Sequence, residues 1–351
     1  MDLSKVLEQA GALWSQAEAT LVGSPWLSGI GLLLALGVGV ALAVLALATL
    51  ARAAMAGRRM MLAGAVKRDS DVGARIIVVR GGAGRARPVS AFTHKAIENY
   101  LKDYMFGGPF RIARYPGGID NEDQAQKLLA RTDADLVVWA EGPRGSKGVA
   151  RILSRPINTF EQQRPAVSFV MPKENAAWNE ALSRALAYGA AKQFRPALGR
   201  PQDFRAERLQ PVVESLLSIL GQRPKADPKL LAELEDDASA GALQLALAGD
   251  DAWIDRSVDI ARATLADINR SASPDRWITA NITLGRALRV KAEKKFDPVM
   301  LREGITYLTE ALEALRSEPR FKLAESAAHA IGEAQKLLGT RRKFSITGGG
   351  L

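Results

Sequence analysis

The chain has 351 residues, a formal net charge of +10 and no cysteine. The lack of cysteine excludes disulfides, thiolate metal sites and cysteine nucleophiles. The two histidines, His94 and His329, lie far apart in sequence, which argues against a zinc site built from histidine. At about 100–200 residues per domain, this length predicts two soluble domains beside any membrane segment.

An uncharged apolar run from Trp26 to Ala51 follows an N-terminal tail at 1–25. About 20 such residues cross the ~30 Å hydrocarbon layer as a helix, which satisfies every backbone polar group internally. We therefore predict one transmembrane helix at 26–51. The alternatives are a buried helix of a globular core and a cleaved signal peptide. The late start of the run, its length and the lack of a basic n-region argue against a signal peptide.

Basic residues follow the apolar run, in a stretch at 52–74 that we predict to be a juxtamembrane linker. They are Arg52, Arg58, Arg59, Lys67 and Arg68. Basic residues stay on the cytoplasmic side, so we expect the N-terminus outside, Trp26 at the outer interface and the bulk of the chain in the cytoplasm. Their position favours topology and contact with membrane lipid over binding of nucleic acid.

Small residues recur every four positions along the predicted membrane helix, at Gly31, Ala35, Gly39 and Ala43. Such a ladder lets two helices approach closely, so it predicts a homo-oligomer held partly through the membrane. The alternative is that glycine and alanine are simply common in this segment.

The stretch 75–221 reads as a small α/β domain with flanking helices. Short apolar strands are predicted at 75–80, 110–115, 135–141, 149–153 and 166–171. Helical spacing predicts helices at 90–104, with Ser90 as N-cap, at 121–131, and near 174–193 and 203–221. Strands and helices alternating in this way predict a compact α/β unit.

A basic glycine-rich loop follows the first predicted strand and carries Arg80, Arg85 and Arg87. Its place between a strand and a helix suits anion binding, but it lacks the third glycine of GxGxxG, and a solvated basic loop is the alternative. Asp135 and Glu141 are the candidate acid/base groups, although residues at strand ends are more often structural. No nucleophile–base pair, metal cluster or phosphate loop is evident, so neither catalysis nor a cofactor is predicted.

The segment Ala134-Asp135-Leu-Val-Val-Trp-Ala-Glu141, followed by a turn and a second strand, resembles the small N-terminal domain of TolB-type proteins of bacteria. This chain has Ala140 where those proteins usually show glycine or a similar small residue. The resemblance covers about 75–155 and implies an interaction module in a bacterial protein.

Beyond a Pro-containing linker at 222–228, the sequence becomes a series of amphipathic helices within 229–339. They are predicted at 229–247, 252–268, 274–292, 298–316 and 321–338, with Pro274 and Pro298 at helix starts. A disordered tail is expected at 340–351.

The pair of helices after Pro274 resembles a tetratricopeptide repeat (TPR). The matching residues are Pro274, Trp277, Leu284, Gly285, Ala287 and Leu288 in the first helix, and Leu301, Ile305, Ala311 and Leu312 in the second. Gly304 and Leu308 depart from the alanine and tyrosine that are usual there. Ala324, Ile331, Gly332 and Ala334 recur at one constant interval after Trp277, Leu284, Gly285 and Ala287. The resemblance implies stacked helix pairs; a generic helical bundle is the alternative.

Taken together, the sequence predicts a membrane-anchored α+β protein with one transmembrane helix, a small α/β domain and an all-α TPR-like region. We expect a single-pass adaptor of the bacterial inner (plasma) membrane whose cytoplasmic repeats bind a protein partner. Two alternatives remain open: a tethered nucleotide- or anion-binding α/β domain, and a basic surface that binds anionic lipid or nucleic acid.

Overall fold

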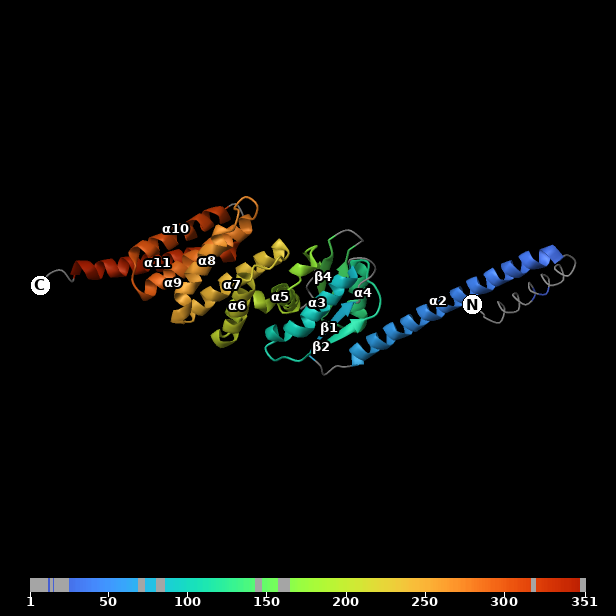
Figure 1. Cartoon of the computed structure of the whole chain (residues 1–351). Helices are drawn as coiled ribbons and strands as arrows, with labels where there is room; N and C mark the ends of the chain where they lie inside the picture. Colours follow the sequence, from blue (N-terminus) through green and yellow to red (C-terminus); the bar gives the residue numbers. More distant parts are fainter. Residues whose placement is uncertain are drawn as a thin grey trace. The chain divides into compact units, whose positions relative to one another are not determined.

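The computed structural model describes residues 25–68, 73–79, 86–142, 147–156, 165–316 and 320–347, together with Ala12 and Ser15. Only the backbone is described at 25–35, 59, 62–63, 65–68 and 341–347. The chain has an apolar N-terminal helix, a small five-stranded mixed sheet and a C-terminal region of helices (Figure 1), which confirms the predicted fold class. It divides into two compact units, Met1–Leu62 and Ala63–Leu351.

The N-terminal helix α2 runs from Pro25 to Arg68. At 44 residues it is about 66 Å long, more than twice the thickness of a hydrocarbon layer. Its stretch Leu36–Arg58 is long and apolar enough to cross a membrane, and none of it is buried in the protein. The helix does not end with the apolar run at Ala51, so the basic stretch 52–68 is helical where the sequence predicts a linker.

The sheet has the strand order β2-β1-β3-β4-β5. Strands β1 (Ala74–Val79), β2 (Phe110–Tyr115) and β3 (Leu136–Glu141) are parallel, and β4 (Val149–Ser154) and β5 (Val167–Val170) continue the sheet antiparallel. The five predicted strands are thus confirmed, and β3 and β4 pair as an antiparallel hairpin.

Each face of the sheet is covered by helices, as its apolar strands require. Ile76 and Val78 pack under α3 (Ala86–Tyr100), the short 3-10 turn η1 (Leu101–Tyr104) and α5 (Glu180–Phe194). Ile77 and Val79 point to the other face and pack under α4 (Glu122–Thr132). Because α3 and α4 lie on opposite faces, the chain reverses its winding between β1 and β3.

Helix α3 begins earlier than the sequence predicts. Its first residue is Ala86, so Ser90 lies inside the helix and is not its N-cap. The buried Ser90 hydroxyl instead donates to the carbonyl of Val79 at 2.6 Å. A buried hydroxyl needs a partner, and the end of β1 supplies one.

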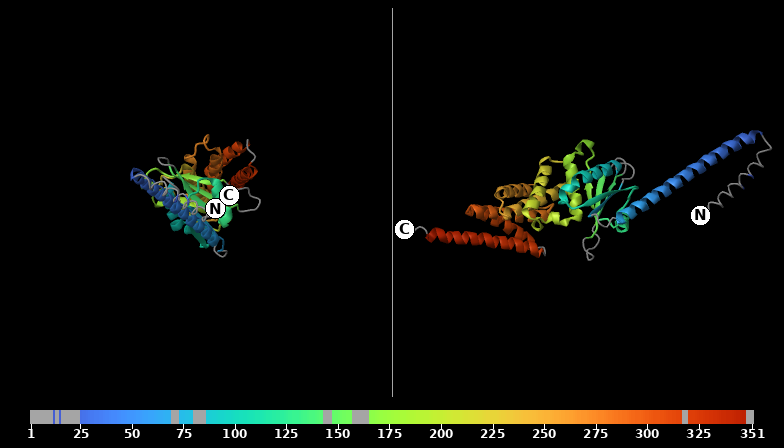
Figure 2. Two further views of the ribbon diagram at one scale, coloured as in Figure 1. Left: turned by 90° about the vertical axis from the view of Figure 1, so that its right-hand side faces the viewer. Right: turned by 90° about the horizontal axis from the view of Figure 1, so that it is seen from below.

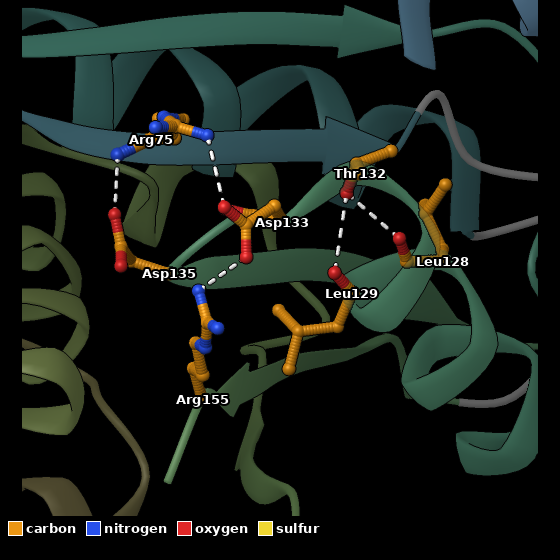
Figure 3. Close-up of polar contacts among 7 residues, drawn as sticks. All are labelled: Arg75, Leu128, Leu129, Thr132, Asp133, Asp135 and Arg155. Atoms are coloured by element: carbon orange, nitrogen blue, oxygen red, sulfur yellow. Dashed lines mark hydrogen bonds and ion pairs between the residues drawn. The ribbon is translucent and has the colours of Figure 1, made fainter. Parts of the chain in front are cut away.

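Asp135 ties the beginnings of β1 and β3 together (Figure 3). The Arg75 amide donates to the Asp135 carboxylate at 2.8 Å, and the Asp135 amide donates to the Arg75 carbonyl at 2.8 Å. At the far end of β3, Glu141 accepts from the Trp139 indole at 3.0 Å and pairs with Arg151 at 2.8 Å. Both candidate acid/base residues therefore make structural contacts within the sheet.

Six long helices follow the short 3-10 turns after α5 (η3, Pro196–Gly199; η4, Pro201–Asp203). They are α6 (Ala206–Gly221), α7 (Pro228–Leu247), α8 (Asp251–Ala266), α9 (Pro274–Lys294), α10 (Pro298–Leu315) and α11 (Phe321–Thr347). Asp227, Asp250 and Asp297 accept backbone N–H donors at the starts of α7, α8 and α10. Helix α11 continues through residues 340–347, where a disordered tail is expected; 348–351 lie outside the described residues.

Consecutive helices from α7 onward form antiparallel hairpins. In the α9–α10 pair, Ile278 and Ile282 near the start of α9 share a cluster with Leu315 at the end of α10. At the other end of the pair, Ala292 packs with Leu301. Figures 1 and 2 show these helices following one another outward from the α/β part.

The predicted linker at 222–228 lies between helices that share a core with the sheet domain. Leu230, Leu234 and Ala238 of α7 belong to the same buried cluster as α5 and the sheet. Val212 and Leu216 of α6 join it. The helical stack is therefore built directly on the α/β part.

Candidate interaction surface

Helices α7, α9 and α11 lie in a row and are linked by ion pairs. Arg276 of α9 binds Glu235 and Asp236 of α7 at 2.6 and 2.7 Å. On its other side, Asp275 of α9 binds Arg320, the residue just before α11, at 2.6 Å. Further along, Arg289 of α9 pairs with Glu333 of α11 at 3.3 Å. The residues that pair ascend together along α9 and α11, so these two helices run parallel.

Helices α8 and α10 form the opposite side of the stack. Arg262 of α8 binds Glu303 of α10 at 2.8 Å. Lys291 of α9 reaches back to Asp255 of α8 at 2.8 Å. First and second helices of successive pairs thus form separate rows, and α7, α9 and α11 share one side of the stack. We refer to it as the α7/α9/α11 face.

The TPR-like residues form the contact between α9 and α10. Leu284, Ala287, Leu288, Leu308 and Ala311 are fully buried, and Trp277 and Ile305 are half-buried. A methyl group on Gly285 would lie 2.6 Å from Leu308 and 2.8 Å from the Gly304 carbonyl. The two departures from the TPR pattern, Gly304 and Leu308, are therefore the residues that Gly285 touches.

The α7/α9/α11 face carries both paired and unpaired charge. Burial alone would lower the pKa of Arg276, but Glu235 and Asp236 more than offset it, so the pKa is raised. Arg286 lies on the same helix and has the opposite balance. Burial and the neighbouring Arg289 lower its pKa, and Glu333 opposes them only in part. The guanidinium of Arg276 is therefore paired with two carboxylates, whereas that of Arg286 is paired with none among the described residues.

The predicted anion loop falls mostly outside the described residues: Arg80 and Arg85 lie there, and Arg87 is exposed in the first turn of α3. Of the predicted membrane ladder, Gly39 and Ala43 are exposed on α2, and a methyl group on Gly39 would meet nothing. Only the backbone of Trp26, Gly31 and Ala35 is described. Arg52 and Arg58 are exposed, and the side chains of Arg59, Lys67 and Arg68 are not described.

A pocket of about 320 Å³ lies at the amino-terminal edge of the parallel strands. Its charged lining residues, Asp133 and Arg155, already pair with each other at 2.5 Å, and Asp133 also binds Arg75 at 3.3 Å (Figure 3). Asp133 adopts a left-handed backbone conformation, φ 55°, at the end of α4, which aims its carboxylate at both arginines. The pocket thus offers no unpaired charged group to a ligand.

Within the described residues, no group of three or more histidine, aspartate or glutamate side chains is arranged to hold a metal ion. No family model, curated protein or solved structure matches this chain. The case for function therefore rests on the geometry of the chain itself.

The sequence pattern predicts the buried side of the helix pairs but not the α7/α9/α11 face. A signal was present, because Arg276, Thr279, Arg286 and Glu293 recur at helical spacing along one stripe of α9. What the sequence alone does not give is the partner of each charge, since Glu235, Asp236 and Glu333 come from other helices.

Proposed function

We propose that this protein is a membrane-anchored adaptor whose TPR-like helical stack binds a protein partner on the α7/α9/α11 face. The observation that carries the proposal is the arrangement of the helices in two rows, with α7, α9 and α11 on one side of the stack and ion pairs linking α9 to α7 and α11. Stacked helical pairs of this kind typically serve as extended binding surfaces. The ion pairs of Arg276 with α7 and of Arg289 with α11 hold the three helices together.

The anchor is part of the proposal. The apolar stretch Leu36–Arg58 would hold the chain in the inner membrane as a single-pass protein. Arg52 and Arg58 at its C-terminal end, with the basic residues that follow, favour a cytoplasmic location for the α/β part and the helical stack. The Gly39/Ala43 ladder favours self-association within the membrane.

The test uses the full-length protein with a photo-crosslinking phenylalanine analogue at one of two matched threonines. Thr279 is exposed on the α7/α9/α11 face, one turn after Asp275, which binds Arg320 just before α11, and Arg276, which binds α7. Thr306 is equally exposed, on α10. Each hydroxyl donates to a carbonyl one turn earlier, at 3.0 and 3.1 Å, so the two sites are locally alike.

We expect the analogue at position 279 to capture a reproducible partner protein in living cells and the analogue at 306 not to capture it. Mass spectrometry of the crosslinked bands measures this. Equal capture at both positions, or no reproducible partner at 279, would contradict the adaptor function.

A second candidate function is anion binding at the carboxyl ends of β1 and β3. It is favoured by the reversal of winding between these strands, because ligands of open α/β sheets bind at that point. Arg85 and Arg87 belong to the segment that follows β1. The test is thermal unfolding of the full-length protein with and without inorganic pyrophosphate. A stabilisation that the Arg85→Ala, Arg87→Ala variant loses supports this function, and no stabilisation removes it.

A further inference from the structure

Arg286 is a cation on the α7/α9/α11 face that has no ion-pair partner among the residues that the structure describes. It lies two turns after Thr279 on the same stripe of α9 and is half-buried. Among the residues that the structure describes, no acceptor lies within hydrogen-bonding or ion-pairing distance of its guanidinium. Arg276, Arg289 and Arg320 on the same face each have a carboxylate partner.

The carboxylates near Arg286 are already engaged elsewhere. Arg289 binds Glu293 at 3.1 Å and Glu333 at 3.3 Å, both through the same terminal nitrogen. The Nε of Arg289 is buried and has no acceptor within the described part of the chain. Arg286 and Arg289 therefore have N–H donors that no carboxylate oxygen of the described residues accepts.

Partial burial of a cation without a paired anion costs free energy, and this burial is the first cause of the lowered pKa of Arg286. A methionine or leucine of similar length could cover the same surface without this cost. Keeping an arginine in this position is reasonable if an anion from outside the chain completes the pair.

We infer that Arg286, with Arg289 beside it, receives a carboxylate of an acidic segment of the partner protein docked on the α7/α9/α11 face. This inference rests on the proposed adaptor function. A planar guanidinium binds a planar carboxylate through two parallel hydrogen bonds, which is the strongest pairing open to it.

The surroundings favour a carboxylate over a phosphate. Glu293 and Glu333 both lie close to Arg289. A phosphate group, with nearly two negative charges at neutral pH, would be repelled by these carboxylates more strongly than a single carboxylate would.

The test compares Arg286→Met with Arg302→Met in the full-length protein, reconstituted in nanodiscs of zwitterionic lipid. Arg302 is exposed on α10 and serves as the matched control. The probes are a fluorescent oligoglutamate peptide, an oligoglutamine peptide and a phosphoserine peptide. Binding is measured by fluorescence anisotropy, and the unfolding temperature of each variant is measured without peptide.

We expect oligoglutamate to bind the native chain in preference to the other two peptides. Arg286→Met should weaken that binding about tenfold or more, because it removes the cationic donor of a partly buried charge pair. The unfolding temperature of the same variant should equal or exceed that of the native chain, since the substitution removes an unpaired, half-buried charge. Arg302→Met should change neither quantity.

Four results would overturn the inference: no binding of oligoglutamate, preference for phosphoserine, equal weakening by the two variants, or a lower unfolding temperature for Arg286→Met. The last would make Arg286 a structural residue.

Crosslinking from position 279 separates this inference from the adaptor function. Unchanged capture in Arg286→Met removes only the acidic-segment inference, whereas no capture in the native background removes the adaptor function itself.

Discussion

At the scale of single residues, Gly285 and Gly304 bring the backbones of α9 and α10 into direct contact. A Cβ on Gly285 would lie 2.6 Å from the Leu308 Cγ and 2.8 Å from the Gly304 carbonyl oxygen. Such an atom fits only if one helix moves. Gly332, which the internal repeat places in correspondence with Gly285, is exposed on α11, and a Cβ there would meet nothing.

These two glycines give opposite predictions for the same substitution. Gly285→Ala should lower the free energy of unfolding by about 1–3 kcal/mol, because overpacking outweighs the better helix propensity of alanine. Gly332→Ala should raise it by up to about 1 kcal/mol, since only the propensity changes. Chemical denaturation of the full-length protein in detergent measures both. A neutral Gly285→Ala would show that the α9–α10 contact is looser than described.

At the scale of elements, a polar cluster joins α5 to α7 and so holds the helical stack on the α/β part. The buried Tyr188 hydroxyl donates to the Asp237 carboxylate at 2.9 Å, and the Lys192 ammonium binds the same carboxylate at 2.7 Å. Glu233 lies 3.6 Å from Lys192. Both donors come from α5 and both carboxylates from α7, one turn apart.

The cluster predicts how stability depends on pH. Burial, with the negative charge of Asp237 adding to it, raises the pKa of Tyr188. Burial alone would lower the pKa of Lys192, but Asp237 and Glu233 reverse the effect and raise it. A group whose pKa is raised on folding stabilises the fold fully below its unfolded value and loses that contribution as pH rises through the folded value.

We therefore expect the free energy of unfolding to fall as pH rises above about 10, the unfolded value of both groups. Tyr188→Phe and Lys192→Met should each make this fall shallower. Equilibrium denaturation across the alkaline range measures it, with Lys102→Met, an exposed lysine of η1, as control. The same slope in all four proteins would show that the cluster does not contribute.

The elements also show what sequence patterns can and cannot predict. Strands β1 to β5 were predictable because apolar runs between turn residues need no knowledge of their neighbours. The start of α3 was not, because Ser90 resembles an N-cap and its true partner is the Val79 carbonyl of another element. The buried side of α9 was likewise predictable from Leu284, Gly285 and Ala287. The pairing of its exposed arginines depends on α7 and α11, which no local pattern specifies.

At the scale of the whole molecule, the open question is which side of the membrane carries the helical stack. Positive charge follows the apolar stretch of α2, and negative charge dominates its N-terminal flank at Asp2, Glu8 and Glu18. Moving the basic flank across the membrane is disfavoured, so the N-terminus should lie outside. A signal peptide would instead place the stack outside, after cleavage.

Because the chain has no cysteine, single introduced cysteines can decide between these arrangements without background labelling. Ser15 precedes α2, and Ser271 is exposed between α8 and α9. In intact spheroplasts, a membrane-impermeant maleimide should label Ser15→Cys at once, and Ser271→Cys only after permeabilisation. The reverse pattern would put the stack outside. Loss of the Ser15→Cys label from the mature chain, together with a shorter product, would identify α2 as a cleaved signal. Only the first pattern leaves the α7/α9/α11 face available to a cytoplasmic partner.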